Sequence, residues 1–177
     1  ANGKGTYVFI DGGYYIGDFK DELRHGEGKY FFENGSSYNG SWKNNLPEGN
    51  GTYIYDDGTK YVGEHKNGQS NGQGVYTSSN GDKYIGEFQD GEKNGNGTYT
   101  FSYGDKYIGE FINDEYHGRG TLIYANGDKY VGEFKDNAFN GRGVFEDIDG
   151  SYYEGDWKNG KYDGQGTYIF QSGDKYV

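Results

Sequence analysis

Aromatic residues recur along the chain at a fixed spacing of 23 residues. The segment 80–88 reads NGDKYIGEF, and nearly the same residues stand at 103–111 and at 126–134. One tyrosine marks each copy of the repeat: Tyr15, Tyr38, Tyr61, Tyr84, Tyr107, Tyr130, Tyr153 and Tyr176. A glycine follows two residues later in the first seven copies: Gly17, Gly40, Gly63, Gly86, Gly109, Gly132 and Gly155. Because no insertion or deletion breaks the spacing, the chain holds just under eight copies of one structural unit.

Each copy contains two short segments rich in strand-forming residues. Residues 98–101 read TYTF and residues 107–111 read YIGEF. Glycine next to asparagine, aspartate or serine between two such segments predicts a β-hairpin. Because side chains alternate along a strand, Tyr107, Gly109 and Phe111 share one face, which is aromatic with a gap at the glycine. We expect Gly109 to lie beneath a neighbouring aromatic ring.

A single hairpin of this kind cannot bury its aromatic face, whereas consecutive hairpins can bury it against one another. The repeat therefore predicts an all-β fold: an elongated, twisted single-sheet solenoid of consecutive antiparallel β-hairpins with a 23-residue repeat, not closed. A leucine-rich repeat is excluded because only Leu23, Leu46 and Leu122 are present. A propeller would need about 40–45 residues for each four-stranded blade. Two copies would supply that length, but nothing in the sequence distinguishes odd from even copies.

The composition shows that the buried surface must come mainly from tyrosine. Hydrophobic residues make up 31% of the 177 residues, and the chain has 35 glycines and 21 tyrosines. Since a tyrosine hydroxyl needs water or a partner, we expect a thin structure with every ring near the surface. We interpret residues 1–177 as one array of about eight units, with both ends inside a repeat, and as a fragment of a longer protein. No apolar run of transmembrane length and no signal-peptide pattern is present in the sequence.

The charge of the chain argues against two classes of partner. The formal net charge is −11, and the sequence contains no cluster of lysine or arginine. Nucleic-acid backbones and anionic lipid headgroups attract basic patches. We therefore expect no nucleic-acid partner, and direct phospholipid binding is disfavoured.

Residues 84–111, YIGEFQDGEKNGNGTYTFSYGDKYIGEF, closely resemble the MORN repeat (membrane occupation and recognition nexus), whose pattern is Y-x-G-E-[WF]-x-x-G-x-x-x-G-x-G. The resemblance covers the whole chain. It implies a sheet of consecutive antiparallel hairpins that scaffolds or recognises rather than catalyses. Similar repeats occur in junctional membrane proteins, ciliary radial-spoke proteins, plant phosphoinositide kinases and a lysine methyltransferase. In being nearly all repeat, this chain is similar to the cytoskeletal MORN scaffolds of protist parasites.

Two groups of polar residues could carry chemistry, and neither has a suitable spacing. One is a column of acids at equivalent positions of the repeat: Asp18, Glu64, Glu87, Glu110, Glu133 and Asp156. Neighbouring members should lie about 10 Å apart, beyond the roughly 5 Å of a retaining glycosidase pair, so we expect them to pair with Lys83, Lys106 and Lys129 or to face water. The other group is His25, His65 and His117, which are too far apart to share a metal except across a dimer. We expect no catalytic residue, no metal site and no cofactor.

One position departs from the repeat in a way that suggests a binding site. Just before the G-x-G segment, the first four copies have polar residues or proline: Arg24, Pro47, Ser70 and Lys93. The next three copies have aromatic rings there: Tyr116, Phe139 and Tyr162. A row of exposed rings on a rigid scaffold is typical of a protein-binding surface, and we predict that these three residues bind protein. The alternative is that the rings pack between hairpins.

These features predict a non-catalytic scaffold and protein-interaction module, not an enzyme. We expect it in the cytoplasm, linking cytoskeletal and membrane-associated assemblies. Its partners would be proteins, bound as an extended peptide or a helix in an aromatic groove. Unpaired edge strands would also allow the terminal hairpins to form a homodimer. The alternatives are a phospholipid-binding membrane-recruitment module, or a regulatory repeat domain of a kinase or methyltransferase whose catalytic part lies outside these residues.

Overall fold

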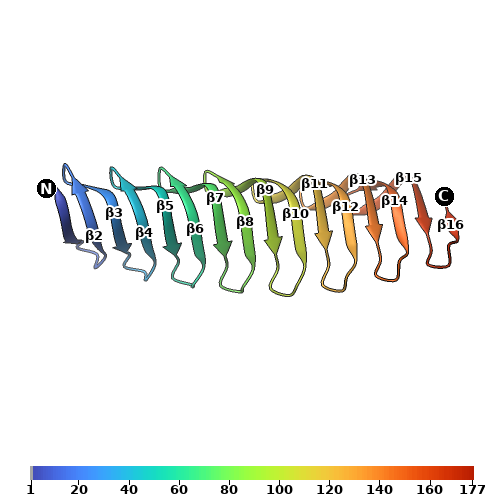
Figure 1. Cartoon of the computed structure of the whole chain (residues 1–177), viewed down its shortest axis with the longest axis horizontal. Coiled ribbons are helices and arrows are strands. Elements are labelled where there is room, and N and C mark those ends of the chain that lie inside the picture. Colours follow the sequence, from blue (N-terminus) through green and yellow to red (C-terminus); the bar gives the residue numbers. More distant parts are fainter. Residues whose placement is uncertain (1) are drawn as a thin grey trace. The chain divides into compact units, whose positions relative to one another are not determined.

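β-Strands and the turns between them make up the structure, a computed structural model that describes residues 2–177. Sixteen strands follow one another along the chain, and the described residues contain no helix (Figure 1). The chain divides into two compact units, one up to Glu92 and one from Lys93, and each is described by itself.

Strands of seven and nine residues alternate in both units, apart from the shorter β1 and β16. The first unit contains β1 (Gly3–Val8), β2 (Tyr14–Lys20), β3 (Leu23–Phe31), β4 (Ser37–Lys43), β5 (Leu46–Ile54), β6 (Lys60–Lys66), β7 (Gln69–Thr77) and β8 (Lys83–Gln89). The second unit contains β9 (Glu92–Thr100), β10 (Lys106–Ile112), β11 (Glu115–Ile123), β12 (Lys129–Lys135), β13 (Ala138–Glu146), β14 (Tyr152–Lys158), β15 (Lys161–Ile169) and β16 (Lys175–Tyr176).

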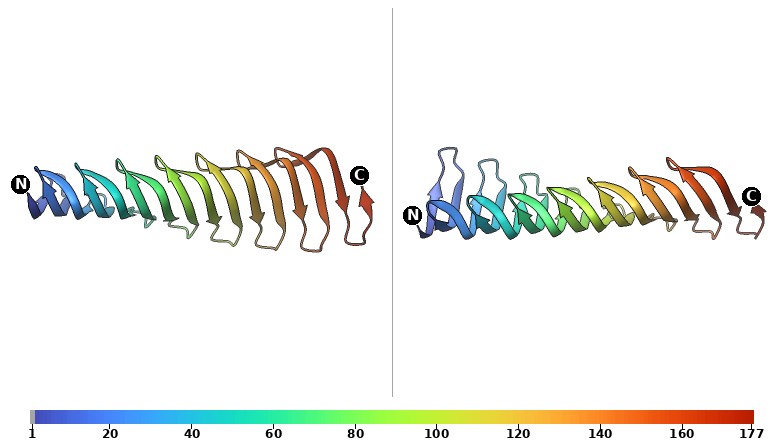
Figure 2. Two further views of the ribbon diagram at one scale, coloured as in Figure 1. Left: turned by 45° about the horizontal axis from the view of Figure 1, so that its top comes forward. Right: turned by 90° about the horizontal axis from the view of Figure 1, so that it is seen from above.

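Within each unit, every strand pairs antiparallel with the strands before and after it in the sequence. Figures 1 and 2 show these hairpins side by side in chain order. In the second unit, Gly109 of β10 faces Gly97 of β9 on one side and Gly120 of β11 on the other. The repeat thus places one glycine of each strand in a row across the sheet. The predicted all-β fold of consecutive antiparallel hairpins is confirmed, and in neither unit does the first strand pair with the last.

Two kinds of connection join the strands. Two-residue turns such as Asn113-Asp114, between β10 and β11, have both residues at positive φ, 49° and 70°. This is the type I′ geometry, which matches the strand twist and which asparagine, aspartate and glycine adopt most readily. Five-residue loops such as 101–105, between β9 and β10, are closed by a hydrogen bond from Phe101 N to Asp105 O at 2.9 Å.

The strand boundaries predicted within the repeat are partly wrong. β10 contains the predicted strand 107–111, but β9 runs from Glu92 to Thr100 instead of covering 98–101. The G-x-G segment belongs to the strand because its glycines also pair with β10. Phe101 begins the following loop, where its backbone closes the turn.

The core of each unit is a row of buried tyrosines on one face of the sheet: Tyr15, Tyr38, Tyr61, Tyr84, Tyr107, Tyr130 and Tyr153. The ring of Tyr107 crosses to the next strand and lies over Gly120. Its hydroxyl passes Gly109 and donates a hydrogen bond to Glu110 O at 2.9 Å, where β10 has a bulge. The prediction that the glycines form the floor under aromatic rings is confirmed. The ring at Gly109 comes from the glycine's own strand, and the same ring reaches Gly120 across the hairpin.

Candidate protein-binding face

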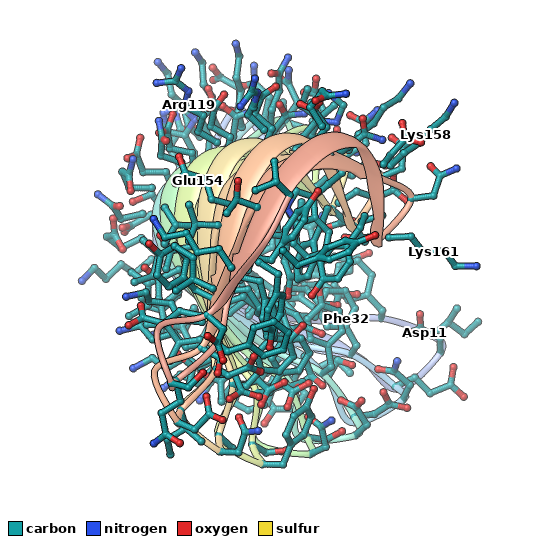
Figure 3. All side chains as sticks on the ribbon, turned by 90° about the vertical axis from the view of Figure 1, so that its right-hand side faces the viewer. Asp11, Phe32, Arg119, Glu154, Lys158 and Lys161 are labelled. Carbon is teal, nitrogen blue, oxygen red and sulfur yellow. The ribbon has the colours of Figure 1, made fainter. Side chains whose placement is uncertain are left out.

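The inner face of the curved strands carries most of the aromatic side chains in each unit, and we call it the aromatic face. Figure 3 shows Phe32 on this side, whereas Arg119 and Glu154 point away from it. In the first unit the aromatic face consists of Tyr7, Phe9, Tyr15, Phe19, Tyr30, Phe32, Tyr38, Trp42, Tyr53, Tyr55, Tyr61, Tyr76, Tyr84 and Phe88. In the second unit it consists of Tyr99, Phe101, Tyr107, Phe111, Tyr116, Tyr124, Tyr130, Phe134, Phe139, Phe145, Tyr153, Trp157, Tyr162, Tyr168 and Phe170.

Edge-to-face contacts hold these rings in fixed orientations. Tyr107 lies between Phe111, at a centroid distance of 5.1 Å and an angle of 87°, and Phe134, at 5.0 Å and 83°. Tyr130 lies in the same way between Phe134 and Trp157. The quadrupole of an aromatic ring favours this T-shaped arrangement, with about 0.5–1.5 kcal/mol per pair beyond area burial. The aromatic face is therefore formed before any partner arrives.

The three predicted binding residues stack on the core tyrosines of their own hairpins. The ring centroids of Tyr116 and Tyr107 are 3.8 Å apart, those of Phe139 and Tyr130 are 3.7 Å apart, and those of Tyr162 and Tyr153 are 3.9 Å apart. Tyr116 and Phe139 are partly buried, whereas 54% of Tyr162 is exposed. All three rings thus contribute to packing, and Tyr162 offers the largest surface to a partner. Their role in binding stays a prediction.

In the first copy of the repeat, the same position holds a cation. The guanidinium carbon of Arg24 lies 4.6 Å from the ring centroid of Trp42 and 4.8 Å from that of Tyr30. The Arg24 Nη2 also donates to Asn45 O at 2.8 Å, and burial lowers the Arg24 pKa from its usual value. From the sequence, Arg24 is only one of the polar residues at this position. The structure shows instead that the aromatic face accepts a guanidinium group by cation–π contact.

The tyrosine hydroxyls of the core act as neutral hydrogen-bond donors. Burial raises the pKa of Tyr15 and of Tyr61 to about 12. Each of these two hydroxyls donates to a backbone carbonyl three residues on, Asp18 O and Glu64 O. Groups that keep their protons and are already bonded to the backbone suit binding and packing rather than proton transfer.

The acidic column stabilises strand pairing. The Glu110 Oε1 accepts a hydrogen bond from the Arg119 backbone N at 3.0 Å, beside the bulge of β10. The equivalent bond, to the residue nine positions later, is made by Asp18, Glu64, Glu133 and Asp156. The expected lysine pairing is wrong for Lys129, which pairs with Glu146 at 2.9 Å.

The histidines do not come together. His65 is buried between the rings of Tyr38 and Tyr61, in the position that Phe88 occupies one repeat later. His117 Nδ1 lies 3.9 Å from a carboxylate oxygen of Asp136. Within residues 2–177, no three potential metal ligands are grouped. No helix long and apolar enough to cross a membrane occurs in that range either.

Two solved structures illustrate what this chain is similar to. The TCP domain of SAS-4 (dCPAP) of Drosophila melanogaster, in complex with a proline-rich motif of Ana2 (dSTIL), aligns with a TM-score of 0.54 at 11% identity, covering 98% of this chain and 87% of that chain. The TCP10c domain of Drosophila melanogaster Sas-4 aligns with a TM-score of 0.44 at 11% identity, covering 98% and 96%. At 11% identity, the first of these similarities shows the fold alone.

Comparison with curated proteins gives no match. The sequence model of the MORN repeat, in contrast, matches eight consecutive segments: residues 1–14, 15–37, 38–60, 61–83, 84–106, 107–129, 130–152 and 153–175. Each of the seven segments from residue 15 onward begins with one of the buried tyrosines described above. The chain therefore belongs to the MORN-repeat family.

Proposed function

We propose that the chain is a non-catalytic protein-interaction scaffold whose aromatic face holds an extended peptide. The observation that carries this proposal is the preformed row of rings, oriented by edge-to-face contacts such as those of Tyr107 with Phe111 and Phe134. Rigid tyrosine and tryptophan side chains give contact area at a small cost in conformational entropy, which is why they dominate protein-binding hot spots. The exposed Tyr162 ring is the strongest of the three predicted contacts.

A proline-rich segment is the type of peptide that this face fits best. Such segments adopt the polyproline II helix and dock on aromatic-lined surfaces, because the helix is already ordered before binding. The SAS-4 TCP domain, which shares the fold at a TM-score of 0.54, was solved in complex with a proline-rich motif. This supports the same mode of recognition for the aromatic face of the present chain.

Tryptophan fluorescence offers a direct test. Trp42 and Trp157 are the only two tryptophans of the chain, and both lie on the aromatic face. Titration with a proline-rich peptide of about twelve residues should change their emission, whereas a glycine–serine peptide of equal length should not. If the proline-rich peptide gives neither a fluorescence change nor heat in calorimetry at millimolar concentration, the proposal is wrong. Flotation of the chain with phosphatidylserine vesicles, in the absence of peptide binding, would favour the phospholipid alternative instead.

A further inference from the structure

The loops that border the aromatic face of the second unit carry negative charge only. The five-residue loops at 101–105, 124–128, 147–151 and 170–174 contain neither lysine nor arginine. They contain five aspartates: Asp105, Asp128, Asp147, Asp149 and Asp174. We call these loops the acidic edge. Lys106, Lys129 and Lys175 begin the strands that follow three of these loops. Because side chains alternate along a strand, these lysines lie on the face opposite to that of the neighbouring tyrosines, such as Tyr107, and Lys129 pairs with Glu146 at 2.9 Å.

Hydrogen bonds hold the carboxylates of the acidic edge in place. The Asp105 Oδ1 accepts from Ala125 N at 2.9 Å, and the Asp149 Oδ1 accepts from Ser151 N at 2.8 Å. Neither aspartate forms an ion pair with another residue described by the structure. Their charges are therefore oriented but not neutralised, which favours a cationic partner.

Aromatic residues adjoin the acidic edge, and the Tyr168 hydroxyl donates a hydrogen bond to Asp147 Oδ2 at 3.1 Å. Phe101 and Tyr103 of the first loop have ring centroids 5.1 Å apart, and 65% of Tyr103 is exposed. Burial raises the pKa of the Tyr124 hydroxyl, and the negative charges of Asp105 and Asp128 raise it further. A ring face together with a carboxylate is the environment that binds a guanidinium or ammonium group.

Two basic side chains of the chain itself show which cations the aromatic rings accept. In the first unit, the Arg24 guanidinium lies over Trp42 and Tyr30 at 4.6 and 4.8 Å. In the second unit, Lys93 Nζ lies 5.7 Å from the ring centroid of Tyr99 and 2.7 Å from Asp114 Oδ1. The chain itself thus places basic side chains on its own rings in both units.

The repeat also fixes the distance between neighbouring loops of the acidic edge. Equivalent loops of one unit are separated by two strands, or about 9.6 Å. A polyproline II helix rises about 9.3 Å in one turn of three residues. Every third side chain of such a helix would therefore meet the next loop of the acidic edge, over all four loops of the unit.

We propose that the aromatic face of the second unit selects a proline-rich segment with arginine at every third position. Each guanidinium lies between an aromatic ring and a carboxylate of the acidic edge, while the prolines pack on the aromatic face. This inference rests on the proposed function, because it specifies the peptide that the aromatic face holds.

Three peptides separate the inference from the function on which it rests. One repeats Pro-Pro-Arg four times, the second repeats Pro-Pro-Gln four times, and the third has the composition of the first with all arginines adjacent. In calorimetry on the full chain, we expect the first to bind about 10-fold more tightly than the second and about 3-fold more tightly than the third. Higher salt should reduce the first difference.

If the first two peptides bind equally, the inference is wrong and the proposed function stands. If none binds, the proposed function fails. If the first and third peptides bind equally, the three-residue spacing of arginine has no effect, and that part of the inference is wrong.

A double variant and its control test whether the carboxylates of the acidic edge contact the peptide. Asp105→Asn with Asp149→Asn removes two charges but keeps the Oδ1 acceptors. Asn126, one repeat before Asp149, already accepts the bond equivalent to that of Asp149, from Asp128 N at 3.1 Å. We expect this variant to weaken the Pro-Pro-Arg peptide about 3- to 10-fold and to leave the Pro-Pro-Gln peptide unchanged. The matched control is Glu115→Gln with Glu154→Gln, which removes two exposed charges away from the acidic edge. An equal loss in both variants would show an effect of net charge alone and would overturn the site.

Discussion

The ring of Tyr107 lies over the backbone of Gly120 on the neighbouring strand, so closely that a Cβ on Gly120 would be 2.6 Å from the ring. The same relationship recurs between Tyr15 and Gly28, and between Tyr130 and Gly143. The buried tyrosine and the glycine of the next strand are therefore one structural feature. It explains how a chain with so few aliphatic residues can build a core.

Gly120→Ala should strongly destabilise the second unit. The added methyl group would meet both the Tyr107 ring and its hydroxyl, and a well-packed ring cannot move aside without disturbing Phe111 and Phe134. Overpacking of this kind costs about 1–3 kcal/mol. The free energy of unfolding in urea measures the loss.

Gly5→Ala is the matched control for that substitution. A Cβ on Gly5 would lie 3.5 Å from the Phe19 ring, which is an ordinary contact. We expect a change of less than about 0.5 kcal/mol in the free energy of unfolding. Equal losses for Gly5→Ala and Gly120→Ala would contradict the explanation by ring contact.

Tyr107→Phe tests the hydroxyl separately from the ring. The substitution keeps the ring contacts but removes the donor to Glu110 O at 2.9 Å, leaving that carbonyl without its partner at the bulge. We expect a loss of about 0.5–1.5 kcal/mol in the free energy of unfolding. Tyr162→Phe is the control, because its ring is largely exposed and its hydroxyl donates to no residue of the described chain. It should change stability by less than about 0.5 kcal/mol.

The sequence alone was sufficient to predict the fold, because one pattern determines it. The 23-residue spacing of Tyr107 and its equivalents, with Gly109 two residues later, requires the same hairpin in every copy. The bounds of β9 were harder to predict from the sequence. Its G-x-G segment reads as a bend, and only its pairing with β10 makes it part of the strand.

The candidate site could be predicted only in part. The ring row at Tyr116, Phe139 and Tyr162 was evident from the sequence, but whether a ring is exposed depends on the side chain that the next hairpin places over it. Phe134 and Trp157 cover the first two rings. The acidic edge was missed because its aspartates are distributed over four loops and adjoin only in the folded sheet. Its signal was the absence of lysine and arginine from every such loop.

His65 should make the first unit less stable at acidic pH. Burial lowers the pKa of His65 below its unfolded value of about 6.5. The unfolded chain therefore takes up the proton first, so this contribution to stability is complete above about pH 6.5 and is lost as the pH falls from there. Phenylalanine occupies the equivalent position at Phe88, so His65→Phe should fold and lack this pH dependence. The free energies of unfolding of the two proteins should diverge between pH 7.5 and 5.5 by up to about 1.4 kcal/mol. A constant difference would show that folding does not lower the pKa of His65.

Phe139→Ala and Tyr162→Ala should separate packing from binding at equivalent positions of the repeat. Phe139 stacks on Tyr130 at 3.7 Å and meets Trp157 edge-on at 5.2 Å, so its removal leaves a cavity between hairpins. We expect a loss of roughly 1–3 kcal/mol in the free energy of unfolding, less than for a fully buried phenylalanine. Tyr162 is 54% exposed, so Tyr162→Ala should cost less than about 1 kcal/mol while weakening a proline-rich peptide by about 5-fold or more. Unfolding in urea and calorimetric titration on the same preparations give both quantities. If Tyr162→Ala loses stability and binding together, the ring belongs to the core, and the partner must contact another part of the aromatic face.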